Sequence, residues 1–570
     1  MTQHDELKLT SATLGPLPLI QHFLDKLDVD GILAQYVPAN DRRFTVPPAA
    51  VLGVLLRNIL VGRAPLYGLA EWTAGFHASV LPLRDHADAL NDDRAGRALD
   101  YLFDADRASI LTALTVRAIR AFSIDLDQLH NDSTSISFSG SYALASGRRI
   151  RGKQALAITH GHSKDHRPDL KQILWILTVS ADGSVPVHYR CCNGNTNDDP
   201  THIETWEALR TLAGKATFLY VADSKLCVRK NLDHIHNHGG RFICVLPRTR
   251  KEDAWFRKHI QDHVPTWEVA VNRSPASFPG TPDVWSAVAS PSRSAEGYRI
   301  IWLASDRGAE RARSARSAMI RKACDGIEEL NKRIRGPKTR FRDRPSVVEA
   351  ADKIIDSVGA QRWVSAVVAE EKEESYHQAA PGRPSPNTKY VKTERIRYSV
   401  AWKENDAAIA YDARSDGMYP LITNCEDLTP SEILLRHKYQ PTLEKRHEQL
   451  KSVYAVAPAF LKNEGRIEAL LLLYYLALLI QALVERQLRR GMKGHGLQEI
   501  PLYPEERDCK APTARRVFDI FANLQRHELW EGGVRRRAFE PELTPIQRQV
   551  LELLDVPETV FAGSKDGPQG

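Results

Sequence analysis

The stretch that decides the fold is LDQLHNDSTSISFSG, residues 126–140, in which apolar and polar residues alternate before Gly140. This alternation, rich in Ser, Thr and Ile and ended by a glycine, predicts a β-strand. Asp132 lies inside the strand, beside Ser133 and Thr134. A carboxylate in a buried strand is costly unless it is paired, reaches the edge of the sheet or binds a cation. The strand therefore indicates both a sheet and a candidate site.

Further strands are predicted on the carboxyl side of this stretch. Apolar runs occupy residues 154–161, 172–180, 185–192, 218–223 and 241–247, with a helical pattern at 204–214 between the third and fourth runs. Strands in succession, then a helix and more strands, predict a mixed α/β domain. Asp223 ends the run FLYVAD, directly before Ser224 and Lys225. It is the second carboxylate placed at the end of a buried strand.

The regions before and after this α/β domain show other residue patterns. Helical periodicity dominates residues 10–122. Strands are predicted at 267–271, 298–305, 396–403, 409–413 and 418–424, with a charged helix from 306 to about 335 and an exposed Gly-Pro-rich loop at 380–392. Helices are expected from 429 to the end. The apolar stretch 469–484 is 16 residues long, short of the ~20 that cross a bilayer, so a buried core helix is predicted rather than a membrane span.

Charge and cysteine content narrow the class of protein. The 570 residues include 78 Lys+Arg and 71 Asp+Glu, which gives a net charge of +7. The first 130 residues hold 12 basic and 16 acidic residues, so the basic excess lies beyond them. The seven cysteines form no CxxC pair, and the first ten residues lack the pattern of a secretory signal. A reducing cytoplasm is therefore expected.

A third carboxylate, Glu444, lies in a stretch that is predicted to be helical after Pro441. Lys451 follows seven residues later, close to two helical turns, so the two should share a face. Two carboxylates on neighbouring strands and one on a helix across them could hold two Mg²⁺ ions for phosphodiester displacement. The spacing alone leaves open that these are three of the 71 acids, placed by surface requirements.

A series of motifs, in order, resembles the DDE transposases of bacterial insertion sequences, the group with a Tyr-Arg-Glu-Lys signature. The series covers about residues 125–490 and reads HNDSTSISFSG, GHSKDHRPDLKQILW, GNTNDDPTH, YVADSKLC, FICVLPRTR, DGMYPLITN and HKYQPTLEKRHEQLK. The resemblance implies that Asp132, Asp223 and Glu444 are the catalytic, metal-binding acids. It also implies that Lys451 is the signature lysine, in contact with a phosphate. The signature's Tyr and Arg positions are His437 and Gln440, and Tyr439 lies out of register, which puts a hairpin-intermediate route in doubt.

The resemblance implies an α/β fold: an RNase H-like mixed-sheet core interrupted by a β-rich insertion, with a helical N-terminal domain and a helical C-terminal part. The expected domains are the helical N-terminal domain at 1–122, for DNA-end binding or dimerisation, and the first part of the core at 123–250. The β-rich insertion with a basic helix at 251–425 follows, then the rest of the core with the Glu helix at 426–495 and a C-terminal helical region and tail at 496–570.

The function implied is that of a transposase, a DNA endonuclease and strand-transfer enzyme of DNA recombination that depends on Mg²⁺, with Mn²⁺ as a possible substitute. The expected partners are double-stranded DNA, as element ends and target, and a second copy of the chain in a homodimeric DNA complex, with no membrane. The expected location is the bacterial cytoplasm, at the nucleoid. Two alternatives stay open: a transposase-derived DNA-binding protein without catalysis, and a metal-dependent DNA nuclease without strand transfer.

Overall fold

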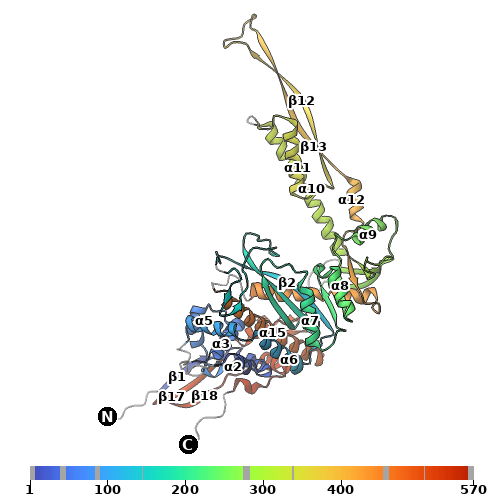
Figure 1. The fold of residues 1–570 in the computed structure, drawn as a ribbon. Helices are drawn as coiled ribbons and strands as arrows, with labels where there is room; N and C mark the ends of the chain where they lie inside the picture. Colours follow the sequence, from blue (N-terminus) through green and yellow to red (C-terminus); the bar gives the residue numbers. More distant parts are fainter. Residues whose placement is uncertain are drawn as a thin grey trace. The chain divides into compact units, whose positions relative to one another are not determined.

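The computed structural model describes residues 7–38, 46–83, 90–143, 145–273, 283–336, 339–453, 461, 463–505 and 507–562. The chain folds into two compact units, drawn together in Figure 1. The first joins Met1–Cys244 to His437–Gly570, and the second comprises Val245–Arg436. Each unit is described by itself.

The sheet of the first unit is built around the strand that carries Asp132. Its strands lie in the order β6-β5-β2-β7-β8, with bounds Pro186–Asn193 (β6), Lys171–Ser180 (β5), Gln128–Phe138 (β2), Leu219–Ala222 (β7) and Arg241–Val245 (β8). β2 pairs antiparallel with β5 and β5 with β6, whereas β2, β7 and β8 run parallel. α7 (Thr201–Ala213) and α8 (Arg229–Asn237) precede and follow β7 in the chain. The predicted mixed α/β domain is confirmed.

Helices form most of the chain before this sheet. They are α1 (Leu17–Leu27), α2 (Val29–Tyr36), α3 (Pro48–Val61), α4 (Leu69–Ala74), α5 (Asp92–Asp104) and α6 (Arg107–Phe122). Side chains cap two of them, because Asn91 accepts a hydrogen bond from Arg94 N at 2.8 Å and Asp106 accepts one from Ser109 N at 3.1 Å. The buried faces of these helices belong to the same core as β2 and β5.

The core of the first unit centres on α15 (Glu464–Gly494), which packs against α3, α5 and α17 (Pro545–Leu554). This helix has 31 residues and is long and apolar enough to cross a membrane, but 89% of its most apolar window is buried inside the protein. The bent pair Pro48–Val61 and Leu66–Ala74 meets the same criterion of length and composition. Burial confirms the predicted core helix, which extends beyond the 16-residue apolar stretch at both ends.

The sequence predicts helices up to the C-terminus, but the C-terminal region also contains strands. After α16 (Ala514–Phe521), β17 (Gln525–Glu531) and β18 (Val534–Phe539) form a hairpin, and β17 also pairs antiparallel with β1 (Leu7–Thr13). Gly532 and Gly533 have φ of 53° and 80°, which suits a tight turn with two left-handed residues. The inward-facing residues of β17 are charged: Arg526 pairs with Glu540, and Glu528 with Arg535. Because those positions are not apolar, the period-two pattern of a strand is hidden.

The second unit combines an antiparallel sheet with helices and a long ribbon. Its sheet strands lie in the order β14-β11-β10-β9, with bounds Met418–Thr423, Arg299–Ser305, Asp283–Ala289 and Glu268–Arg273. The other elements are α9 (Lys251–Asp262), α10 (Asp306–Arg335), α11 (Arg344–Ser357), β12 (Val364–Gln378), β13 (Tyr390–Glu404) and α12 (Asp406–Ala413). The charged helix lies at its predicted position, and the Ser305 hydroxyl caps it by accepting a hydrogen bond from Gly308 N.

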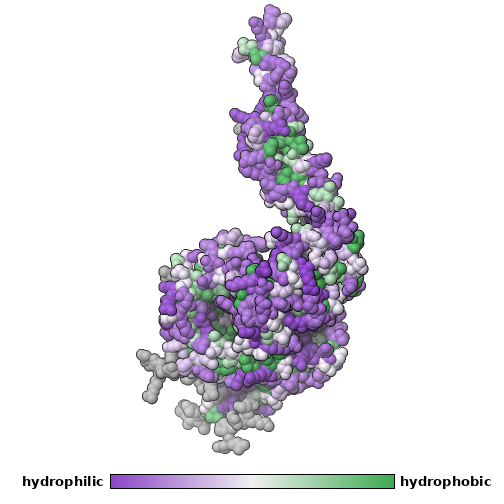
Figure 2. Space-filling view, turned by 45° about the vertical axis from the view of Figure 1, so that its right-hand side comes forward, coloured by the Kyte–Doolittle hydropathy of each residue, from purple (hydrophilic) through white to green (hydrophobic). Residues whose placement is uncertain are grey.

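β12 and β13 pair in register from Val364 opposite Glu404 to Gln378 opposite Tyr390. One end of this ribbon packs on α10 and α11, in a core separate from that of the first unit. In Figure 2 apolar residues gather where the ribbon lies beside the helices, and its far end is mostly hydrophilic. A ribbon of two strands buries little by itself, so its order depends on the helices at its base.

Two predicted strands are absent among the described residues. Residues 409–413 lie in α12, because the Asn405 side chain caps that helix by accepting a hydrogen bond from Ala408 N and three of the next four residues are alanines or isoleucine. Residues 155–161 have only isolated bridges, such as Thr159 opposite Gln172. Both stretches are short and apolar, and this is where strand and helix or loop are hardest to distinguish.

Candidate active site

The sheet places Asp132 and Asp223 next to each other. In the parallel pair of β2 and β7, Asn131 lies opposite Ala222, so the next residue of each chain segment is an aspartate. Neighbouring strands are about 4.8 Å apart, and residues in register project from the same face. Asp223 keeps an extended backbone (φ −73°, ψ −172°), and its side chain accepts a hydrogen bond from Lys225 N at 3.0 Å. The two acids predicted from the sequence therefore share one end of the sheet.

A lysine and a further acid complete this cluster. The Lys164 ammonium lies 3.1 Å from Asp198 Oδ2 and 3.9 Å from Asp132 Oδ1. It also donates hydrogen bonds to the carbonyl and hydroxyl oxygens of Ser133, at 2.7 and 2.6 Å. The Ser133 hydroxyl donates in turn to Asp198 Oδ2 at 2.7 Å. The single ammonium group of Lys164 therefore lies between the carboxylates of Asp132 and Asp198.

The pKa values of Asp132 and Asp223 are both raised. Burial raises the pKa of Asp132 to about 7; Lys164 opposes the shift, while the charges of Asp223 and Glu444 add to it. Burial also raises the pKa of Asp223, again opposed by Lys164 and increased by Asp198. A carboxylate whose pKa is raised both by burial and by neighbouring acids is stabilised by any added cation. Perturbed groups that cluster in this way are typical of functional sites.

Glu444 lies on α14 (Gln440–Glu448), which packs against β2. Gln440, at the signature's Arg position, has its side-chain oxygen 2.8 Å from His130 Nδ1 and donates to the Asn131 carbonyl at 3.2 Å. Glu444 lies one helical turn farther along, on the same side as Gln440. Its side chain is exposed, and its charge acts on Asp132. Gln440 therefore docks the helix directly beside the first acid.

The three acids are near one another but do not form a closed ligand cage. Among the residues that the structure describes, the group whose ligand atoms all lie within 4.8 Å of one another consists of Glu207, His234 and His238, and not of the three acids. Glu444 is exposed and can change rotamer. Joint coordination of an ion would need such a movement of the Glu444 side chain toward Asp132.

Lys451 lies in a π-helical turn and not in the uninterrupted α-helix that its seven-residue spacing from Glu444 assumes. The helix continues from Glu448 as this turn, η5 (Gln449–Val453), which has more residues per turn than an α-helix, so seven residues no longer amount to two turns. The Lys451 ammonium lies 2.6 Å from Asp165 Oδ1. π-helical turns are rare in proteins, and those that do occur are often found at functional sites. Contact with a phosphate would require Lys451 to exchange Asp165 for that ligand.

A buried ion pair anchors α14 to the core. Arg446 Nη1 lies 2.9 Å from Glu485 Oε2 of α15, and each side chain is 4% exposed. Arg446 Nε also donates to the Ser184 carbonyl at 3.0 Å. The next residue, His447, is buried with no hydrogen-bond partner on either ring nitrogen, and Nε2 lies 3.7 Å from Asp132 Oδ2. Burial lowers the pKa of His447 to about 3, so a neutral imidazole lies beside the acid cluster.

The donor set suits a hard divalent cation. Asp132, Asp223 and Glu444 offer only carboxylate oxygens, the ligands that Mg²⁺ and Mn²⁺ prefer. Burial and neighbouring acids raise the pKa values of the two aspartates despite Lys164, so an added cation would favour their charged forms. The residues present therefore fit the ion that the resemblance implies.

Sequence reasoning missed two members of the cluster. Asp198, which is 9% exposed, lies in the motif GNTNDDPTH just before α7, and Lys164 lies in the loop before β5. The motif containing Asp198 is part of the resemblance, but nothing in its spacing shows that this acid meets Ser133. Lys164 lies in the motif GHSKDHRPDLKQILW, but nothing in that motif shows that its ammonium lies beside Asp132 and Asp198.

Several basic residues form ion pairs within the protein. Arg167 pairs with Asp169 at 2.7 Å, Arg250 with Glu296 at 2.7 Å, and Arg316 of α10 with Asp416 at 2.6 Å. By contrast, Arg307 and Arg311 of α10 are exposed and have no acidic partner within 4.0 Å among the described residues. The charged helix therefore presents only part of its positive charge to a ligand.

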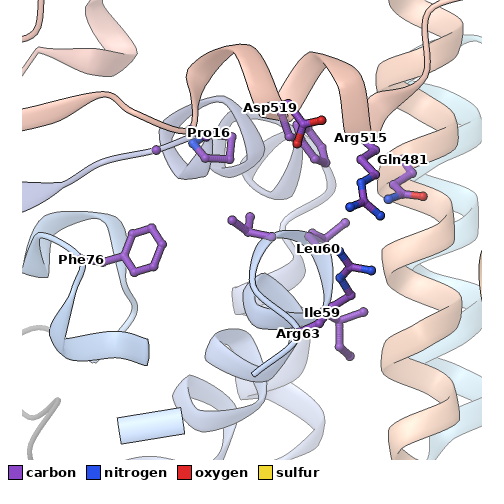
Figure 3. Close-up of a pocket in the computed structure, with 12 residues that line it drawn as sticks. Pro16, Ile59, Leu60, Arg63, Phe76, Gln481, Arg515 and Asp519 are labelled. Atoms are coloured by element: carbon purple, nitrogen blue, oxygen red, sulfur yellow. The ribbon is translucent and has the colours of Figure 1, made fainter. Parts of the chain in front are cut away.

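A pocket of about 190 Å³ lies elsewhere in the first unit (Figure 3). Its walls come from α3, α15, α16 and the residues just before α1, and Arg63, Gln481 and Arg515 lie together on one side of it. None of the four predicted site residues lines this pocket. The pocket is therefore separate from the acid cluster.

Comparison with known proteins gives limited matches. Residues 9–116 match a family described as a domain of unknown function (DUF4277). No curated protein matches the chain. A cryo-EM structure of the piggyBac transposase synaptic complex with hairpin DNA is similar to this chain with a TM-score of 0.40 and 9% sequence identity, over 97% of this chain and 88% of that chain.

Proposed function

We propose that the chain is a DDE transposase that cleaves the ends of an insertion sequence and joins the freed 3′-OH to target DNA. The observation that carries this proposal is the register of β2 and β7, which sets Asp132 beside Asp223, with the Glu444 helix docked on β2 through Gln440. Two neighbouring aspartates, with a third carboxylate on the helix docked against the same strand, have little use in a protein that only binds an anionic polymer. Repulsion from phosphates would make them unfavourable unless a cation lies between.

The arrangement of the first unit supports an RNase H-like core. Its antiparallel strands β6, β5 and β2 are followed across the sheet by the parallel strands β7 and β8, with α7 and α8 as connections. In this interpretation the second unit is the insertion between the second and third acids. Both acids of the sheet and the Glu444 helix belong to the first unit.

The residues of the chain have separate roles in this mechanism. Asp132, Asp223 and Glu444 would hold Mg²⁺ or Mn²⁺, which when bound activates the attacking oxygen and stabilises the leaving oxygen. Lys164 orients and partly neutralises Asp132 and Asp198, and the neutral His447 lies beside Asp132. Lys451 would bind a phosphate next to the cleaved bond after leaving Asp165. Water and then the 3′-OH serve as nucleophiles, so no protein side chain forms a covalent bond to DNA.

The test is an assay with labelled DNA that carries the element's ends, a target plasmid and Mg²⁺. The proposal expects cleavage followed by joined product from the wild-type chain, and neither from Asp132→Asn, which should keep most of its DNA binding. Binding without cleavage by the wild-type chain would contradict it and leave a transposase-derived DNA-binding protein. Cleavage without joining would leave a metal-dependent nuclease.

The proposed partners follow from this activity. They are double-stranded DNA and a second copy of the chain, since two element ends must be held together, and the proposed location is the bacterial cytoplasm at the nucleoid. The size of the complex with one end and with two ends, measured by light scattering, tests the homodimer.

A further inference from the structure

The structure points to a second metal site, for a Zn²⁺-class ion, on the outer surface of α7 and α8. These helices contact each other and lie side by side in Figure 1. Glu207 of α7, His234 of α8 and His238 at the end of α8 each offer one ligand atom, and the three atoms lie within 4.8 Å of one another. Two imidazoles and one carboxylate form a donor set that suits Zn²⁺, Ni²⁺ or Cu²⁺ and not Mg²⁺.

Helix geometry brings the two histidines together. Residues four apart in a helix lie on one face, and the rings of His234 and His238 have centroids 4.2 Å apart. The His238 Nδ1 lies 2.7 Å from the His234 carbonyl oxygen, which can only accept, so Nδ1 carries the proton. Nε2 of His238 therefore keeps a free lone pair. A ring hydrogen bond to a backbone carbonyl is the usual support of a metal-binding histidine.

The carboxylate is already in place beside this pair. His234 Nε2 lies 2.8 Å from Glu207 Oε1. Two ligand atoms of a tetrahedral Zn²⁺ site, each ~2.0–2.1 Å from the ion, are about 3.3 Å apart. A displacement of about half an ångström would therefore admit an ion in place of the hydrogen bond. Arg210 pairs with the other oxygen, Oε2, at 2.7 Å, so Oε1 stays available.

Trp206 holds the two rings in position. This residue is fully buried, and its ring makes an edge contact with His234 at 5.8 Å and lies 6.3 Å from His238. Ligands that are fixed before binding lose less entropy when the ion arrives. His238 is exposed, so a water molecule can complete the coordination. Because Arg210 places a positive charge beside Glu207, we expect an affinity in the micromolar range rather than that of a closed four-ligand site.

An ion at this position would fasten α7 to α8, the helices that precede and follow β7 in the chain. Asn231 of α8 already donates a hydrogen bond to the Asp199 carbonyl, in the segment before α7, at 2.7 Å. The metal site adds a second link near the middle of α7, at Glu207. It would stabilise the first unit whatever chemistry the acid cluster performs.

The experiment is a calorimetric Zn²⁺ titration of the full chain carrying Asp132→Asn and Asp223→Asn, which removes most of the carboxylate site. One Zn²⁺ should bind per chain, with a rise in Tm and no such response to Mg²⁺. His238→Gln in this background should weaken Zn²⁺ binding roughly tenfold or more. Because His238 is exposed, its substitution should leave the Tm without metal unchanged.

His236→Gln is the matched control, since His236 is exposed on the same helix but does not belong to the ligand group. It should bind Zn²⁺ as tightly as its parent. A second ligand variant, Glu207→Gln, should also lose affinity. The inference is overturned if the parent binds no Zn²⁺, if His238→Gln binds it unchanged, or if His236→Gln loses as much affinity as His238→Gln.

Discussion

Asp132 is held in an environment that disfavours its charge, and this has a measurable consequence for stability. Burial raises its pKa to about 7, far above that of an unfolded aspartate. Between about pH 4 and 7 the folded chain keeps a proton that the unfolded chain releases, so the free energy of unfolding falls as the pH rises through that window. An asparagine side chain at this position does not titrate. We expect Asp132→Asn to stabilise the metal-free protein by about 2–4 kcal/mol at pH 8 and by less at pH 5.

Urea denaturation at both pH values, in the presence of a chelator, measures this difference. Asp169→Asn is the control, because Arg167 lowers the pKa of Asp169 and its substitution should give no such gain. Added Mg²⁺ should stabilise the wild-type chain and have much less effect on Asp132→Asn. Equal stability of wild type and Asp132→Asn at pH 8 would show that the charged Asp132 carboxylate does not destabilise the folded chain.

The pairing of Lys451 with Asp165 yields a second prediction for single residues. Asp165 competes with DNA phosphates for the ammonium, to which it lies at 2.6 Å. An exposed ion pair contributes about 0.2–1 kcal/mol, so Asp165→Asn should tighten binding of element ends by up to about fivefold. Lys451→Ala should weaken it. Fluorescence anisotropy at one fixed salt concentration compares the variants, and tighter binding by Lys451→Ala would refute the role given to Lys451.

At the scale of residues, the sequence could predict only what is local. Asp132 and Asp223 could be identified because each interrupts or ends an apolar run, and a buried carboxylate demands an explanation. Asp198 and Lys164 could not be identified from the sequence. Each contacts Ser133 in the fold, but they lie 65 and 31 residues from it in the chain. The catalytic roles of Asp132, Asp223, Glu444 and Lys451 remain predictions that the activity assay tests.

Among the elements, the position of α14 depends on one buried ion pair. Glu485 accepts from Arg446 at 2.9 Å and from the Ala514 amide at 3.1 Å. Glu485→Gln would leave the Arg446 charge buried without a counter-ion, which costs about 3–5 kcal/mol. It should also release α14 from α15 and lower the cleavage rate through displacement of Glu444. Urea denaturation and the cleavage assay measure the two effects.

A replacement of both partners distinguishes the ion pair from the packing around it. Arg446→Met combined with Glu485→Leu removes both charges and should recover much of the stability lost in Glu485→Gln. If Glu485→Gln costs less than about 1 kcal/mol, the pair does not anchor α14.

Elements with strong periodicity were predicted well, and elements set by long-range pairing were not. The charged helix α10 and the core helix α15 follow from their patterns, since capping and apolar spacing are local. β17 was missed because its inward side chains are charged and its partner β1 lies at the other end of the chain. The π-helical turn at Lys451 was also missed, because a spacing of seven residues assumes an uninterrupted α-helix.

For the whole molecule, the distribution of charge matters more than the net value of +7. The second unit, residues 245–436, has 32 Lys+Arg and 27 Asp+Glu, and the first has the remaining 46 and 44. The second unit therefore carries +5 of the total. Much of its basic charge is internally paired, as Arg316 and Arg250 show, so only unpaired side chains are available for phosphates.

Arg307 and Arg311 are such side chains, one turn apart on the exposed face of α10. Each phosphate contact releases counter-ions and adds about 0.9 to the slope of log Kd against log salt. The double variant Arg307→Gln, Arg311→Gln should therefore bind DNA more weakly and lower that slope by up to about 2. Arg293→Gln is the matched control: this exposed arginine of the same unit is already neutralised by Glu426 at 2.7 Å and should leave the slope unchanged. Titration of binding against KCl separates the two results. An unchanged slope in the double variant would mean that α10 does not contact phosphates, and that the +5 of the second unit serves its own ion pairs rather than DNA.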